Sequence, residues 1–202
     1  MMSRFLHRSE DGLLIVASVL LMLINLPAYA INYIDEAENW FASITTMKAN
    51  FTQIGSDGTL AEGELHLRRP YRMKIIYDLD EPLVLLTTPV WLHVDRLEKK
   101  MLTSYPIGET PLSLILQEKV RLRSDEFKTN SFLRDGIVSI VMEKRTGKAA
   151  GVLTLEFTEL PFELRRWTII DAADVTTTVT LQNMQYGHKY ENKFFTPSNY
   201  QR

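Results

Sequence analysis

Cysteine is absent from all 202 residues of the chain. Without it the protein can form no disulfide, cannot bind a metal or cluster through thiolates, and cannot be anchored through a lipidated N-terminal cysteine. The folded chain must therefore be held together by its core alone.

The chain also lacks a strong excess of charge of either sign. It has 23 Lys and Arg against 25 Asp and Glu, a formal net charge of −2, and no tract rich in lysine or arginine. Nucleic-acid-binding proteins need such a basic patch to neutralise phosphates. We therefore expect no nucleic acid among the partners.

The familiar catalytic patterns are missing as well. There is no Gly-x-Ser-x-Gly elbow, no P-loop and no Gly-x-Gly-x-x-Gly, and His66, His93 and His188 are too far apart for a zinc motif. His93 and Asp95 share a strand face and could form a base with its orienting carboxylate, but such pairs are more often a solvated face. Five acidic residues lie close together in sequence and could include the two carboxylates of a glycosidase: Glu62, Glu64, Asp78, Asp80 and Glu81. Acidic residues that flank hairpins are, however, usually only solvated. The sequence predicts no enzyme, no metal and no cofactor.

Long hydrophobic runs are scarce, and the single candidate lies at the start of the chain. Leu13 to Leu26 is apolar, Arg4 and Arg8 precede it, and Ala28-Tyr29-Ala30 has the small-x-small form of a cleavage site. A run of this length falls short of the roughly 20 residues that span a bilayer. We interpret residues 1–30 as a secretory signal peptide, with an uncleaved membrane anchor as the alternative.

Removal of that leader would leave residues 31–202, and 202 minus 30 is 172 residues. This length suits one domain with a sizeable core. No internal repeat, low-complexity tract or linker divides it. We expect a single free domain in the periplasm.

An amphipathic helix is predicted first. Its apolar residues recur at spacings of three and four: Ile34, Ala37, Trp40, Phe41, Ile44, Met47 and Phe51. Asn32, three residues before Asp35, is the predicted N-cap. The pattern therefore predicts a helix that continues to about Phe51.

Short strands with a period of two follow the helix. Tight turns are predicted at Asp57-Gly58 and Asp135-Gly136. The predicted strands are Phe51–Gly55, Thr59–Leu67, Tyr71–Tyr77, Pro82–Thr87, Val90–Val94, Lys99–Ser104, Glu126–Leu133, Ile137–Glu143, Val152–Thr158, Leu164–Asp171 and Val175–Gln182. A short helix at Pro111–Glu118 interrupts them. This order predicts an antiparallel meander that curls toward a barrel.

The strand faces indicate an apolar inside. Leu65 and Leu67 share one face of their strand, whereas His66 and Arg68 share the other. The stretch from Leu83 to Leu86 is apolar on both faces, which predicts cover on both sides of the sheet. These patterns are compatible with a filled core or with a cavity, and composition does not separate the two.

Three blocks, in order, connect the chain to a known family. They are Asn50-Phe51-Thr52-Gln53, then Gly63-Glu64-Leu65 running into Arg69-Pro70, then Gly108-Glu109-Thr110-Pro111-Leu112. Behind a secretory leader they resemble the LolA family of periplasmic carriers of outer-membrane lipoproteins. The resemblance implies an α+β fold: an open antiparallel half-barrel of about eleven strands with an N-terminal helix and short lid helices. The acyl chains of a lipoprotein would enter the apolar space beneath the lid.

The resemblance also assigns roles to residues. Arg69 looks like the family's arginine before the proline, which is thought to bond the lid helices and couple their opening to hand-over. The residues expected to form the acyl-chain cavity and lid are Trp40, Phe41, Ile44, Leu65, Leu67, Met73, Ile75, Leu85, Trp91, Leu112, Leu114 and Ile115.

The partners implied are acylated lipoproteins, an inner-membrane lipoprotein-releasing transporter, and an outer-membrane acceptor or the membrane itself, with the carrier a monomer. The alternative is a periplasmic binder or sensor of another apolar ligand on the same fold.

Overall fold

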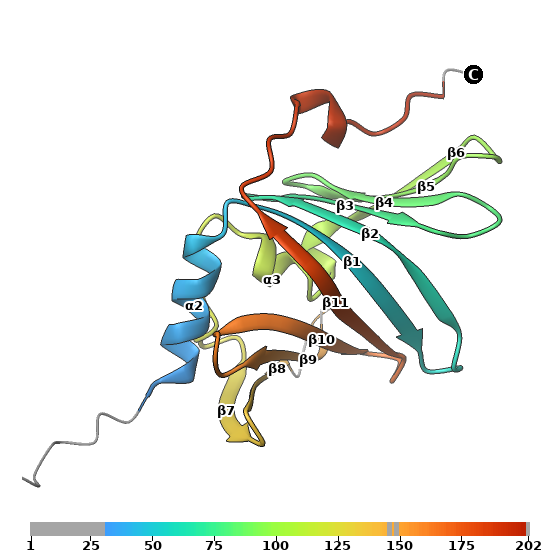
Figure 1. Ribbon diagram of the computed structural model, residues 1–202. Helices are drawn as coiled ribbons and strands as arrows, with labels where there is room; N and C mark the ends of the chain where they lie inside the picture. The colour runs from blue at the N-terminus through green and yellow to red at the C-terminus, as the bar shows by residue number, and fades with distance from the viewer. Residues whose placement is uncertain (1–30, 145–146, 148–149, 201–202) are drawn as a thin grey trace, which may run out of the picture. The chain divides into compact units, whose positions relative to one another are not determined.

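The computed structural model describes residues 31–144, 147 and 150–200. The predicted signal peptide lies outside the described residues. Asn32–Arg202 forms one compact unit. Among its described residues, one helix and three short helical turns accompany one sheet (Figure 1).

The sheet has eleven antiparallel strands, as the sequence and the resemblance predict. They are β1 (Thr46–Gly55), β2 (Leu60–Arg68), β3 (Arg72–Tyr77), β4 (Leu83–Thr87), β5 (Trp91–Arg96), β6 (Met101–Pro106), β7 (Lys128–Arg134), β8 (Ile137–Lys144), β9 (Gly151–Thr158), β10 (Glu163–Asp171) and β11 (Thr176–Tyr186). Their order is β6-β5-β4-β3-β2-β1-β11-β10-β9-β8-β7, so the first and last strands of the chain's series pair in the middle. Strands β6 and β7 are the two edges, and the sheet is strongly curved without closing (Figure 1). The predicted open half-barrel is confirmed.

Gly63 in β2 shows why one of the family-like blocks needs glycine. A Cβ atom at this position would lie 2.0 Å from the Ile76 carbonyl oxygen and 2.9 Å from a carbon of the Phe51 ring. Only a residue without a side chain allows β3 and the Phe51 ring to pack this closely against β2.

The N-terminal helix α2 (Tyr33–Ser43) is shorter than predicted. It ends at Ser43, and β1 begins at Thr46, so the prediction of a helix reaching Phe51 was wrong. Met47 and Phe51 fit a helical spacing, but they also alternate with exposed positions and face the core from β1. The prediction for Asn32 was also wrong in part: it precedes the helix, but its side chain makes no capping hydrogen bond.

The inner face of the curved sheet carries the core. Buried apolar side chains from the strands meet Ile34, Ala37 and Phe41 of α2. Phe157 of β9 packs edge-on against Trp40 and Phe41, with ring centroids 5.6 and 6.1 Å apart. The helix therefore covers part of the inner face.

Residues 187–200, which we call the C-terminal segment, cover the outer face of the sheet over strands β2 to β5. In Figure 1 it runs on the opposite side of the sheet from the helical turn α3 (Ser113–Leu116). Phe194 packs on His66 at 4.9 Å, and Lys74 lies over the Phe194 ring at 4.6 Å. The predicted cover on both sides of β4 is confirmed: Val84 and Leu86 are buried on the outer face, whereas Leu83 and Leu85 are partly buried against the core.

The pair His93 and Asp95 lies beneath the same segment. Both side chains are buried, so the interpretation of a solvated strand face was wrong. His93 Nδ1 is 2.8 Å from Ser104 Oγ, and Asp95 accepts a hydrogen bond of 2.7 Å from Tyr200. These contacts tie the end of the chain to β5.

Candidate functional site

Residues 107–118, which we call the lid segment, cross the inner face between β6 and β7. They contain a 3-10 turn, η2 (Ile107–Glu109), and the single-turn helix α3, where a helix over Pro111–Glu118 was predicted. Pro111 lies just before α3, and its carbonyl accepts from the Leu114 N–H at 3.2 Å. The regular helix is thus shorter than predicted and begins at Ser113.

The apolar side of the lid segment is packed into the core. Ile115 and Leu116 are 6% and 1% exposed, and Leu112 and Leu114 pack against the same cluster while partly exposed. In the described structure, the side chains of the lid segment therefore occupy part of the space inside the curved sheet.

Arg69 holds the end of the lid segment. It follows β2, and its guanidinium donates hydrogen bonds to the Phe41 carbonyl of α2, to the Gln117 carbonyl at 2.5 Å and to the Glu118 carbonyl at 3.2 Å. Its Cζ also lies 5.7 Å from the centre of the Phe41 ring. One side chain therefore joins α2 to the residues that follow α3.

The hydrogen-bond partners of the Arg69 guanidinium are backbone carbonyl oxygens. Among the described residues, Arg69 Nε is buried without a hydrogen-bond partner. The helix-end carbonyls it binds carry partial negative charge. Burial lowers the pKa of Arg69 from its usual value, but the group stays protonated at neutral pH.

Tyr71 adds a backbone contact at the same place. Its N–H donates to the Leu116 carbonyl at 2.7 Å, and its own carbonyl accepts from the Thr87 hydroxyl at 2.8 Å. Tyr71 has a φ of 64°, an uncommon conformation for a residue other than glycine. Three successive carbonyls, at residues 116 to 118, are thus held by Arg69 and Tyr71.

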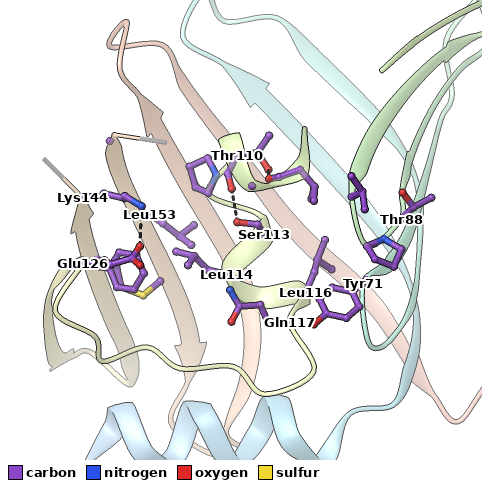
Figure 2. A pocket seen from close by; sticks show the side chains of 18 residues that line it. Tyr71, Thr88, Thr110, Ser113, Leu114, Leu116, Gln117, Glu126, Lys144 and Leu153 are labelled. Atoms are coloured by element: carbon purple, nitrogen blue, oxygen red, sulfur yellow. Dashed lines mark hydrogen bonds and ion pairs between the residues drawn. The ribbon is translucent and has the colours of Figure 1, made fainter. Parts of the chain in front are cut away.

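A pocket of about 480 Å³ opens beside the lid segment. Thr110, Ser113 and Leu114 form its lid side, and Figure 2 shows Leu114 facing Leu153 of β9. The turn before β5 contributes Val90. This volume lies within the range of roughly 300 to 1,000 Å³ that is usual for ligand sites.

The rim of the pocket carries an ion pair. Lys144 of β8 lies 2.9 Å from a Glu126 carboxylate oxygen (Figure 2). The Glu126 side chain is 67% exposed, and surface pairs of this kind contribute little to stability. The interior of the pocket is mainly apolar, with Phe127, Met142 and Leu153 on its sheet side.

Most of the predicted cavity residues lie in or against the core cluster. Phe41, Leu65, Leu67, Met73, Ile75 and Ile115 belong to it, and Trp40, Ile44, Leu85, Leu112 and Leu114 pack against it. Leu114 is the member of the predicted set that also lines the pocket in the described structure.

Trp91 is placed differently from the prediction. It is 43% exposed and shares the outer face of β5 with His93 and Asp95, so it does not point to the inner face. The turn at Thr88-Pro89-Val90 sets this register, with the Thr88 N–H bonded to the Trp91 carbonyl at 2.8 Å. Its neighbour Leu92 packs on the core instead.

Sequence reasoning missed the contribution of β8 and β9 to the pocket. Met142 and Leu153 lie on the faces of their strands that carry Val138, Ile140, Leu155 and Phe157, and this apolar period of two was visible in the sequence. The carbonyls at Gln117 and Glu118 and the Tyr71 N–H had no sequence signal, because any residue type supplies those groups.

The described residues meet the requirements of neither a metal site of three or more ligands nor a membrane-spanning helix. Among residues 31–144, 147 and 150–200, no group of three His, Asp or Glu side chains could hold a metal ion. Within the same described residues, no helix is long and apolar enough to cross a membrane. The class that the structure defines is an open antiparallel sheet whose apolar inner face is partly covered by a helix and by the lid segment.

Comparison with known proteins identifies the family. The family described as "Outer membrane lipoprotein carrier protein LolA" matches residues 42–198, so the chain belongs to the LolA family. This is a family of periplasmic carriers rather than of enzymes.

Individual relatives are distant. An uncharacterized protein of Rickettsia prowazekii (strain Madrid E) is 24% identical over 115 residues, which is 56% of this chain and 54% of that protein. The chain thus matches about half the length of this relative.

Two solved structures are similar to this protein in fold. A DUF1329 family protein from Desulfovibrio piger ATCC 29098 has 9% identity and a TM-score of 0.51, over 81% of this chain and 95% of that one. A LolA superfamily protein from Nitrosomonas europaea has 6% identity and a TM-score of 0.49, over 81% and 96%.

Proposed function

We propose that the protein is a periplasmic carrier that buries the acyl chains of lipoproteins and moves them from the inner to the outer membrane. Family membership supports a carrier of lipoproteins in general. The observation that carries the finer proposal is the way the lid is held: the half-buried Arg69 hydrogen-bonds the backbone carbonyls that follow a short apolar helix on the inner face of an open sheet.

Acyl chains would have to displace the lid segment. Each buried methylene is worth about 0.8 kcal/mol, so one long chain gains on the order of 10 kcal/mol and three about 30. A favourable binding free energy of more than roughly 20 kcal/mol would exceed what non-covalent complexes reach in practice, and it would prevent release of the cargo. The carrier must therefore lose part of the gain elsewhere.

Opening of the lid segment costs free energy and therefore opposes the binding of acyl chains. Exposing Leu114, Ile115 and Leu116 would cost about 1.5–3 kcal/mol for each side chain. Breaking the Arg69 hydrogen bonds adds to that cost. Closure of the lid then favours release, because the same contacts reform when the acyl chains leave.

The pocket with the lid closed supports a second candidate. Its volume of about 480 Å³ suits one ligand of moderate size. A periplasmic binder or sensor of another apolar ligand could use it without lid opening. Such a binder would need no transporter and no acceptor, whereas a carrier needs both. Dependence on these partners therefore distinguishes the two functions.

The proposed partners follow from the carrier function. Cargo would be delivered by an inner-membrane lipoprotein-releasing transporter and accepted by an outer-membrane lipoprotein or by the membrane itself. Residues 31–202 would act as a single monomeric domain after removal of the leader.

Binding can be tested with a triacylated lipopeptide and its deacylated form. Trp40 packs against Phe157 and Trp167 is 3% exposed, so both report on the interior. We expect saturable fluorescence changes with the triacylated peptide alone. Equal responses to both peptides, or none in folded protein, would contradict the proposal.

A further inference from the structure

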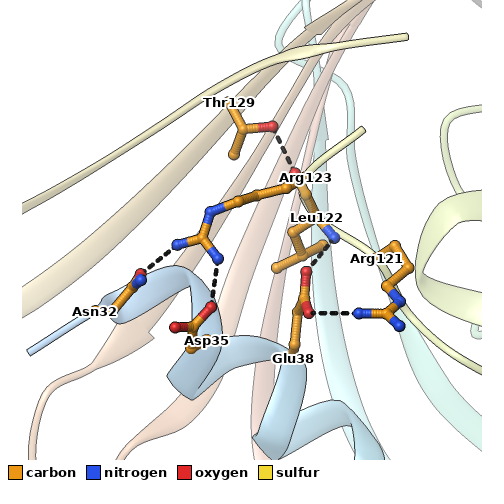
Figure 3. Close-up of polar contacts among 7 residues, drawn as sticks. All are labelled: Asn32, Asp35, Glu38, Arg121, Leu122, Arg123 and Thr129. Carbon is orange, nitrogen blue, oxygen red and sulfur yellow. Dashed lines mark hydrogen bonds and ion pairs between the residues drawn. The ribbon is translucent and has the colours of Figure 1, made fainter. Parts of the chain in front are cut away.

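We propose that Glu38 is a positioning residue that anchors the far end of the lid segment, so that the lid swings about residues 117–119. This inference rests on the proposed function, because it concerns how the same lid is held. The cluster that supports it lies between α2 and the chain that leads into β7, beyond the Arg69 latch (Figure 3).

Glu38 binds a buried backbone group. Its Oε1 accepts a hydrogen bond of 2.7 Å from the Leu122 N–H, and its Oε2 lies 3.8 Å from Arg121. The Leu122 carbonyl accepts a hydrogen bond of 2.5 Å from the Thr129 hydroxyl of β7. Both backbone polar groups of Leu122 are therefore held by side chains of other elements.

The Leu122 side chain is fixed as well. It is 0% exposed, and nearby Val120 is 5% exposed. The Glu38 side chain itself is only 18% exposed. A carboxylate bonded to a backbone N–H in a largely buried place is a strong, directional contact.

A neighbouring pair completes the cluster but is more open to water. Arg123 donates hydrogen bonds to Asp35 and to Asn32 Oδ1. The Arg123 and Asp35 side chains are 47% and 55% exposed, so this pair should hold the chain less firmly. The Asn32 contact also uses the oxygen that was expected to cap α2.

Three exposed residues, 117–119, separate the buried Leu116 from the buried Val120. On one side Arg69 and Tyr71 hold the carbonyls of residues 116–118, and on the other Glu38 and Thr129 hold Leu122. For the lid segment to open, the Arg69 hydrogen bonds must break. The contacts of Glu38 and Thr129 with Leu122 remain, and they keep the C-terminal end of the lid segment in position to close again. The movement is then concentrated in residues 117–119.

Hydrogen exchange of the lid segment, without any lipid, tests this assignment. In Glu38→Ala the Leu122 N–H loses its acceptor, and we expect amides of residues 107–118 to exchange about tenfold faster. Glu38→Gln keeps an oxygen acceptor and should stay close to the unmodified protein. Glu36→Ala changes an exposed carboxylate on the same helix and is the matched control.

A double mutant separates positioning from general stability. If Glu38 and Arg69 hold the same lid, Glu38→Ala should add little to the faster lid exchange of Arg69→Leu. Unchanged lid exchange in Glu38→Ala, fully additive effects, or equal acceleration across the central strands would overturn the inference. Because lipid is absent, the result does not depend on whether the protein binds acyl chains.

Discussion

At the scale of single residues, Arg69 joins the lid to the rest of the protein. In the sequence, Arg69 was recognised as the candidate lid-holding residue because Pro70 follows it and the family-like block Gly63-Glu64-Leu65 precedes it. What the sequence could not provide was the set of partners, since all of them are backbone carbonyls of Phe41, Gln117 and Glu118.

We predict that Arg69→Leu retains or tightens binding of a triacylated lipopeptide but loses transfer to acceptor membranes. The leucine cannot hydrogen-bond the carbonyls, so the closed lid is weakened and reclosure no longer drives release. Binding and transfer of a labelled lipopeptide can be measured side by side. Arg68→Leu is the control, because Arg68 binds the Tyr190 carbonyl on the outer face. Normal transfer by Arg69→Leu would count against the latch.

His66, which contacts the C-terminal segment, should make the stability of the folded protein depend on pH. Burial lowers its pKa below the usual value, Lys48 and Lys74 act in the same direction, and Glu64 opposes them. Its Nδ1 is 3.1 Å from the Tyr190 hydroxyl. The folded protein therefore disfavours the protonated ring.

The sign of the pH effect follows from that lowered pKa. Above about pH 6.5 the ring is neutral in both states; below it the unfolded chain takes up a proton more readily, so stability is lost as pH falls. We predict a smaller decrease in the urea midpoint between pH 7.5 and 5.5 for His66→Gln than for the unmodified protein. His188→Gln, at an exposed position, should retain the full decrease. An identical decrease in all three proteins would show that His66 does not couple to folding.

At the scale of elements, the strands were predictable and the helix end was not. Alternation of apolar and polar residues predicted most of the eleven strands, and a continuous apolar run predicted the strand that contains Leu83 to Leu86. Between Ile44 and Phe51 the apolar residues satisfy both periods, and the β-branched Ile44, Thr45 and Thr46 favour the strand. Sequence spacing alone could not decide between them.

The C-terminal segment was not predicted, because Tyr190, Phe194 and Phe195 follow no period. Phe195 is 4% exposed and lies beneath the Arg68 guanidinium. We predict that Phe195→Ala lowers the free energy of unfolding by about 3 kcal/mol. Leu160→Ala, at an 89% exposed position, should change it by less than about 0.5 kcal/mol. Equal urea midpoints for the two variants would show that the segment is not part of the folded core.

The lid segment should compete with cargo for the inner face. Leu116→Ala removes side-chain burial worth about 2 kcal/mol from the closed lid, so acyl-chain binding should tighten by about 30-fold. Leu86→Ala is a matched control, since Leu86 is 3% exposed on the outer face. It should lower stability without tightening binding. Titration of both variants with the lipopeptide measures this, and weaker binding by Leu116→Ala would argue against competition.

At the scale of the whole molecule, the sequence predicted the open sheet and its apolar inside through the resemblance and the strand faces. It did not predict how far the lid's own side chains fill that inside, because composition is the same for a filled core and a closed cavity. Trp91 shows the same limit: the turn before it decides its face, and a shift of one residue reverses the side.

The central claim is that acyl chains replace the lid on the inner face of the sheet. Hydrogen exchange of the unmodified protein with and without a triacylated lipopeptide tests it most directly. We predict faster exchange in residues 107–118 on binding, with slower or unchanged exchange in β2 and β3. Saturable, acyl-dependent binding that leaves lid exchange unchanged or slower would contradict the claim and favour a ligand held beneath a closed lid.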